Sequence, residues 1–228
     1  MKKFLLAIAT MSLFVVNVSA QHDVTKFLGI PVDGDKVEMI KKLKEKGYKT
    51  IPYREDVLTG EFNGENVNIY VVTNNNKVYR IMVSDVNTRD ETDIRIRFNR
   101  LCQQFKRNKK YISATLEDNT IPEDENISHQ ILVNKKRYES IYYQLPATID
   151  SVAIANDVSS FLLSKFTEEQ LNNPTDELKK EMLISSFSYI LDKFSKNSVW
   201  FTISEFSGKY YISMYYDNEY NRANGEDL

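Results

Sequence analysis

The residues best suited to recognise a ligand lie close to the C-terminus. A Ser207-Gly208 turn would fold the last two strands into a hairpin. One side of that hairpin would carry aromatic rings interleaved with hydroxyl groups, namely Trp200, Tyr211 and Tyr215 with Thr202, Ser204 and Ser213. Because tyrosine and tryptophan combine apolar area with a polar tip, such a side could bind a protein or a glycan. The alternative, which we favour because exposed aromatic patches are uncommon on monomers, is that helices from residues 148–196 cover it.

Residue types that perform covalent chemistry are scarce. A serine or cysteine nucleophile needs an imidazole base, and His129 stands alone between an acidic loop and an expected strand. Cys102 lies among apolar residues at helical spacing, which predicts a buried, slow thiol. Phosphate-binding glycine loops and the motifs HExxH, CxxC and GxSxG do not occur. We therefore predict no catalytic residue and no cofactor.

Charged residues form two local runs. The acidic run in residues 117–125 lacks the spacing and glycine of a calcium loop, so no metal site is predicted. The basic run in residues 95–110 is typical of a solvated helix face, or of a surface for an anionic envelope partner. A carboxylate pair for glycan or peptide hydrolysis stays open as an alternative, since carboxylate separation is a property of the fold.

The first twenty residues predict export. Lys2 and Lys3 precede an apolar stretch, and Val18-Ser19-Ala20 offers the small residues of a cleavage site, so the mature chain would begin at Gln21. Without the two lysines the formal charge changes from −2 to −4, which excludes a nucleic-acid binder held by bulk positive charge. The apolar stretch is too short for a membrane span. We expect a protein of the periplasm or the cell exterior.

The N-terminal half reads as a helix followed by a strand meander. Asp35 caps an expected helix over residues 35–46. The Asn63-Gly64 turn would place Leu58 opposite Ile69. A three-residue turn at Asn74–Asn76 would then place Ile69 opposite Ile81 and keep the apolar residues on one side.

The C-terminal half begins with a second helix, capped by Thr88. Its apolar stripe has helical spacing and consists of Ile94, Phe98, Leu101, Cys102 and Phe105. Strands are expected at 131–133 and 138–143. Helices follow over 148–196, with Asn173 as the cap of the second one. Residues 61–64 and 205–208 (EFNG and EFSG) are similar and could mark two related halves.

The segment Phe27–Gly34, the lysine-rich helix after it and the EFNG turn resemble small secreted α+β proteins of Gram-negative envelopes. More distantly, residues 27–110 resemble the β-lactamase-inhibitor-like fold shared with outer-membrane assembly lipoproteins, although the acylated cysteine of those lipoproteins is absent. We predict one α+β domain over residues 21–228, with an antiparallel sheet and helices packed mainly on one face. The expected function is a non-enzymatic exported module that binds a protein or glycan partner.

Overall fold

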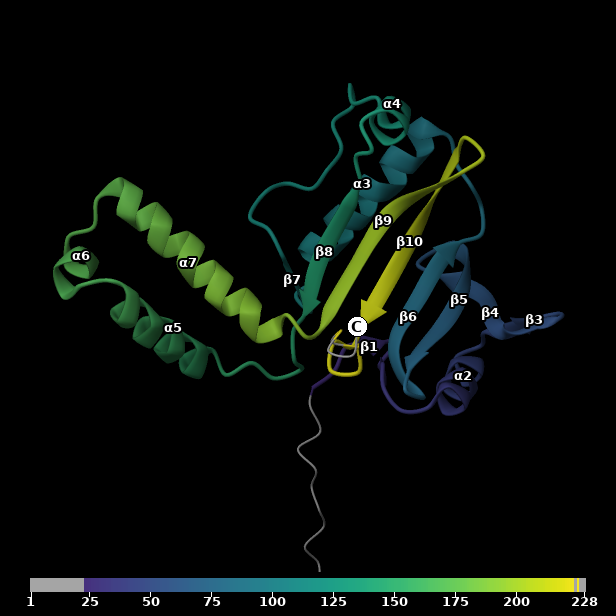
Figure 1. Ribbon diagram of the computed structural model, residues 1–228, viewed down its shortest axis with the longest axis horizontal. Coiled ribbons are helices and arrows are strands. Elements are labelled where there is room, and N and C mark those ends of the chain that lie inside the picture. The colour runs from purple at the N-terminus through teal and green to yellow at the C-terminus, as the bar shows by residue number, and fades with distance from the viewer. Residues whose placement is uncertain (1–22, 224, 226–228) are drawn as a thin grey trace, which may run out of the picture.

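The computed structural model describes residues 23–223 and 225, and its α+β architecture confirms the predicted fold class (Figure 1). The predicted signal peptide and its cleavage site lie outside the described residues. Two short strands, β1 (Lys26–Phe27) and β2 (Ile30–Pro31), pair with each other. The main antiparallel sheet has eight strands: β3 (Lys49–Ile51), β4 (Arg54–Phe62), β5 (Glu65–Asn74), β6 (Lys77–Asp85), β7 (Tyr111–Ser113), β8 (Glu139–Gln144), β9 (Ser198–Phe206) and β10 (Lys209–Asp217). The helices are α2 (Lys36–Glu45), α3 (Glu91–Arg107), α4 (Ile127–Leu132), α5 (Ser151–Lys165), α6 (Glu168–Asn172) and α7 (Asp176–Phe194).

The main sheet consists of two meanders joined at their last strands. Its order is β3-β4-β5-β6-β10-β9-β8-β7, so β6 and β10 form the seam. Each half begins with a helix and contributes four strands, α2 with β3–β6 and α3 with β7–β10. In the second half, α4 lies between β7 and β8, and α5–α7 lie between β8 and β9. The halves are therefore related in topology. The EFNG and EFSG turns are not equivalent, because the first joins the second and third strands of its half and the second joins the third and fourth.

The two long helices adjacent to the sheet cover the same face. Asp35 caps α2 as predicted, and its carboxylate accepts from the Glu38 amide at 2.9 Å. The cap of α3 is Asp90, whose carboxylate accepts from the Asp93 amide, so the prediction of Thr88 as the cap was wrong. The predicted apolar stripe of α3 is buried throughout and packs on the sheet, where the Phe98 and Phe201 rings lie 5.0 Å apart.

The β5–β6 register differs from the predicted one. The β4–β5 register is as expected, with Leu58 opposite Ile69. The turn after β5, however, contains only Asn75 and Asn76, both with positive φ, and Ile69 faces Val83 instead of Ile81. A bulge between Val72 and Thr73 changes the pairing register, which restores the apolar face that a plain two-residue turn would have lost.

Two further sequence expectations fail in the second half. Ile131 and Leu132 belong to α4, which Asn126 caps, so there is no strand at residues 131–133. The cap of α7 is Thr175 instead of Asn173, because the Thr175 hydroxyl accepts from the Leu178 amide. The second error concerns only the choice of the capping residue. An asparagine or threonine side chain that reaches a free amide decides the local helix start, and several candidates stood within three residues.

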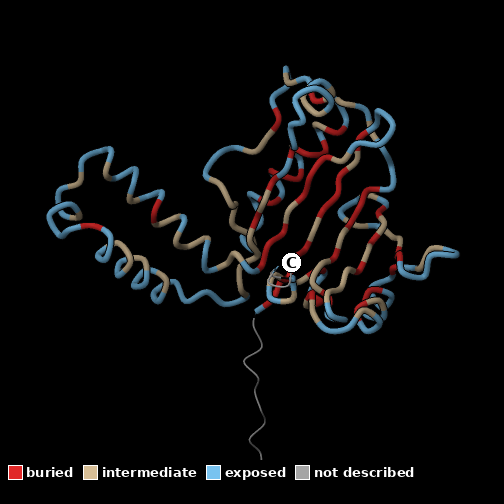
Figure 2. The backbone as a smooth tube through the Cα atoms, viewed as in Figure 1, coloured by how far each residue is buried: buried red, intermediate tan, exposed pale blue. Residues whose placement is uncertain are grey.

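The helical segment inserted between β8 and β9 stands away from the sheet as an arm, defined here as α5–α7 (Figure 1). Within the arm, Phe161 stacks on Tyr189 with centroids 4.5 Å apart, and Lys193 pairs with Asp157 at 2.5 Å. Ser185 is the only buried residue of the three arm helices (Figure 2). The arm therefore leaves the sheet face uncovered, and the expectation that residues 148–196 cover the aromatic side was wrong.

Cys102 should react slowly with a thiol reagent in the native protein. Its side chain is 5 % exposed, and burial raises the pKa of the thiol to about 11. At pH 8 only about one such thiol in a thousand is ionised, and only the thiolate reacts. We expect slow labelling by a chromogenic disulfide at pH 8 and rapid labelling in 6 M urea, with a cysteine peptide as the unprotected control. Equal rates in both solvents would contradict the burial.

Candidate functional site

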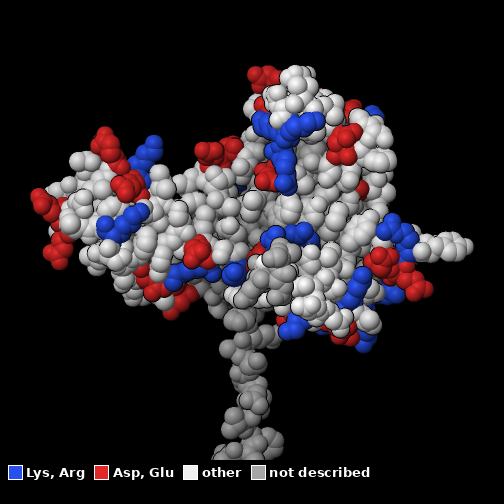
Figure 3. Space-filling model, viewed as in Figure 1, with Lys and Arg blue, Asp and Glu red and all other residues white. Residues whose placement is uncertain are grey.

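The open face of the main sheet is the side opposite α2 and α3, and the terminal hairpin places the predicted aromatic residues at its centre. The β9–β10 register pairs Trp200 with Tyr215 and Ser204 with Tyr211, as the sequence predicted. Figures 1 and 3 look onto this face. In the space-filling view it shows wide uncharged areas, whereas charged groups gather mainly around its rim and on the arm (Figure 3).

The five predicted binding residues divide into two groups. Trp200, Tyr211 and Tyr215 are partly exposed, so they can contact a partner. Thr202 and Ser213 are buried beneath them: the Thr202 hydroxyl donates to the Tyr138 carbonyl at 2.9 Å, and Ser213 shares a hydrogen bond of 3.0 Å with Ser204. These two hydroxyls therefore support the face instead of presenting polar groups on it.

Arg80 and Asp217 lie beside Trp200 and Tyr215, and neither was predicted from the sequence as a site residue. Arg80 donates from Nε and Nη2 to the two carboxylate oxygens of Asp217 at 2.6 and 2.7 Å. This hydrogen bonding raises the pKa of Arg80, while burial opposes the rise. The Trp200 indole also donates to Asp217, at 3.0 Å. No local signal could have revealed this group, because Arg80 and Asp217 lie 137 positions apart.

The rings of this centre contact one another through their faces. Trp200 and Tyr215 stack with centroids 4.0 Å apart and planes 18° apart. The Arg80 guanidinium lies 4.9 Å from the Tyr215 centroid and 5.6 Å from that of Trp200, which is cation–π distance. We call Arg80, Trp200, Tyr215 and Asp217 the aromatic centre. The two rings therefore occupy one face of each other, which leaves less free ring face for a partner.

Several other ionisable groups singled out from the sequence take part in contacts that hold the fold. In the basic helix, Arg97 is buried and pairs with Asp85 at 3.3 Å, and Arg95 donates to the Glu125 carbonyl at 2.7 Å. The Glu125 carboxylate of the acidic loop accepts from Tyr138 at 2.5 Å. The backbone amide of His129 donates to Asn126 in the cap of α4.

Neither the described side chains nor the comparisons assign a chemistry to the protein. Over residues 23–223 and 225, no group of three or more histidine, cysteine or acidic side chains could hold a metal ion. No helix in the same residues combines the length and the hydropathy needed to cross a membrane. No family model, curated protein or solved structure matches the chain.

Two alanine variants test the assignment of the two sheet faces. Phe201 is fully buried, so Phe201→Ala should lower the free energy of unfolding by about 3–5 kcal/mol. Tyr215 lies on the open face, and Tyr215→Ala should cost about 1 kcal/mol, the scale of a cross-strand aromatic pair. Urea melts measure both. Similar losses in the two variants would mean that the open face is covered.

A third variant tests the ion pair of the aromatic centre. Asp217→Asn leaves the Arg80 guanidinium partly buried without its carboxylate, and should cost about 2–4 kcal/mol in a urea melt. Asp157→Asn, which breaks the exposed pair with Lys193 on the arm, is the matched control and should leave the urea midpoint unchanged. A harmless Asp217→Asn would show that the pair does not hold the centre together.

Proposed function

We propose that the chain is a non-enzymatic, exported module that binds a protein partner through the open face of the sheet. The observation that carries the proposal is that the aromatic centre is left uncovered by every described helix. With seven spacings of about 4.8 Å between its strands, the face is about 34 Å wide. That width suits a protein interface of standard size, which takes about 800 Å² from each partner.

The ring geometry favours a protein over a glycan. A sugar binds best on a free aromatic face, whereas Trp200 and Tyr215 use their facing surfaces on each other and Arg80 lies against both rings. Trp200, Tyr211 and Tyr215 are each partly exposed and can still contact a partner. Tryptophan, tyrosine and arginine are also the residue types that dominate protein–protein hot spots.

The arm extends the same surface beyond the β7 edge. Several of its apolar side chains are largely exposed: Val152, Leu163, Leu183 and Ile184 are 69, 58, 61 and 48 % exposed. Large exposed apolar areas in a soluble protein mark interaction sites. A partner that crosses the open face and continues onto the arm would bury both.

Site-specific photo-cross-linking tests the proposal in the exported, full-length chain. A benzoylphenylalanine at Tyr211, on the open face, should give one adduct of defined mass that protease removes and glycosidase leaves intact. The same group at Lys41, on the exposed side of α2, is the control and should give no such adduct. Excess wild-type protein should compete for the adduct, whereas excess Trp200→Ser/Tyr215→Ser protein should not.

The outcomes separate the candidate functions. An adduct sensitive to glycosidase would replace the protein partner by a glycan. Equal adducts from Tyr211 and Lys41, or no adduct from Tyr211, would overturn binding through the open face. Recovery of the protein in the cytoplasm with Met1 at its N-terminus would overturn the export that we propose for residues 1–20.

A further inference from the structure

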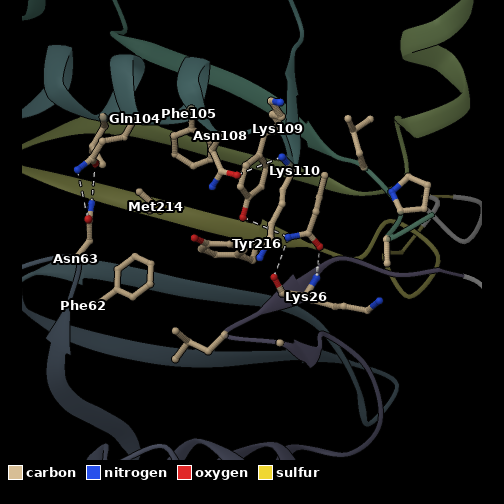
Figure 4. Close-up of a pocket in the computed structure, with 18 of the residues that line it drawn as sticks. Lys26, Phe62, Asn63, Gln104, Phe105, Asn108, Lys109, Lys110, Met214 and Tyr216 are labelled. Atoms are coloured by element: carbon tan, nitrogen blue, oxygen red, sulfur yellow. Dashed lines mark hydrogen bonds between the residues drawn. The ribbon is translucent and has the colours of Figure 1, made fainter. Parts of the chain in front are cut away.

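A groove of about 1150 Å³ lies on the helix-bearing side of the main sheet (Figure 4). It runs between the C-terminal half of α3 and the β1–β4 region, across strand β10. Its central apolar side chains come from three elements: Phe62 of β4, Leu101 and Phe105 of α3, and Met214 of β10. Further apolar lining residues come from the β1–β2 turn and the segment after β8, namely Leu28, Leu145, Pro146, Ala147 and Ile149. The volume lies slightly above the usual range of about 300–1,000 Å³ for ligand pockets. The groove is therefore large enough for a ligand with an extended apolar body.

One end of the groove is closed by two amides and carries a single carboxylate, that of Glu61. Asn63, in the turn after β4, donates to Gln104 of α3 at 2.8 Å, and Gln104 donates back at 3.4 Å. Glu61 lies at this end, close enough to Tyr48 that burial and the Glu61 charge together raise the pKa of the Tyr48 phenol. No lysine or arginine lines this end, and the Glu61 carboxylate would repel a ligand anion.

The opposite end is cationic. Lys26, Lys109 and Lys110 line it, and Asp23 is the one acidic residue among the lining residues there (Figure 4). Asp23 pairs with Lys26 at 3.1 Å, whereas Lys109 and Lys110 form no ion pair with any described residue. Both are exposed, and neither would have to break an existing ion pair to contact an anion.

Neutral hydroxyls and one amide form the floor beside the lysines. Gln144 donates to the Tyr111 hydroxyl at 3.2 Å and to the Lys26 carbonyl at 3.1 Å, and accepts from the Lys26 amide at 2.6 Å. Burial raises the pKa of Tyr111 and of Tyr216, so both phenols stay protonated and uncharged at neutral pH. The lysines therefore set the charge of this end.

We propose that the groove binds a long-chain carboxylate, with the carboxylate at Lys109 and Lys110 and the alkyl chain directed toward the Asn63–Gln104 bridge. The charge difference between the two ends, combined with the apolar side chains between them, favours this ligand and this orientation. The groove and the open face lie on opposite sides of the sheet. The proposal is therefore independent of the protein-binding function, and either can fail alone.

Isothermal titration calorimetry with dodecanoate, below its micelle concentration, tests the proposal on the whole protein. Dodecanoate should bind saturably at one site per chain, and at least tenfold more tightly than dodecyltrimethylammonium, which has the same chain and the opposite charge. Affinity should rise about two- to fourfold per methylene from octanoate to dodecanoate, because each methylene buries further apolar area. Acetate should give no measurable heat.

Lysine variants locate the carboxylate. Lys109→Gln/Lys110→Gln should weaken dodecanoate binding about five- to tenfold, the loss expected for two exposed charge contacts. Lys41→Gln/Lys44→Gln on the outer side of α2 is the matched control and should bind like the wild type. Tyr215→Ala, on the open face, should also leave this affinity unchanged.

Several results would overturn the proposal. These are equal affinity for the carboxylate and the ammonium ligand, affinity that does not depend on chain length, and equal losses in the two double-lysine variants. Heat without saturation would show non-specific adsorption. Because the substituted lysines are exposed, circular dichroism of the variants should match that of the wild type, so lost binding cannot be attributed to unfolding.

Discussion

The pairing of β6 with β10 is the constraint on which the rest of the structure depends. It joins two four-stranded meanders into one sheet through the pairs from Ser84–Ser213 to Arg80–Asp217. Without this seam each meander would expose a nine-residue strand, with free amides and carbonyls along a whole edge. The outer edges that remain, β3 and β7, are only three residues long. The bidentate ion pair of Arg80 and Asp217 reinforces one end of the seam from the open side.

Strand β10 also explains why the protein has two separate surfaces of interest. Successive side chains of a strand point to opposite faces. Met214 and Tyr216 therefore reach the groove under α3, whereas Tyr215 and Asp217 belong to the aromatic centre on the open face. A shift of β10 by one residue would turn Met214 and Tyr216 to the open face. It would place Tyr215 and Asp217 on the side of the core. The register of one strand thus fixes the chemistry of both sides.

The sequence predicted what short-range spacing determines and missed what tertiary pairing determines. The stripe of α3 and the terminal hairpin were predictable because helical period and turn residues are local properties. The β5–β6 register was not, since the bulge compensates for a turn that looks unfavourable by itself. The contact between Trp200 and Arg80 was equally hidden, because pairing of β6 with β10 is what brings Arg80 close to the indole ring. Apolar composition predicted that residues 148–196 pack on something, but composition does not say on which surface.

The insertion of the arm between two adjacent strands has a consequence for the order of folding. Pairing of β8 with β9 closes a connection of about fifty residues, and the entropic cost of closure rises with the logarithm of that length. Helical hairpins form from local contacts within microseconds, faster than distant strands find each other. Once α5 and α7 have packed, the ends of the connection are near one another, and the Gln144 amide reaches the Asn197 carbonyl at 2.8 Å. The arm thus turns a distant strand pairing into a nearly local one, which lowers the entropic cost of pairing β8 with β9.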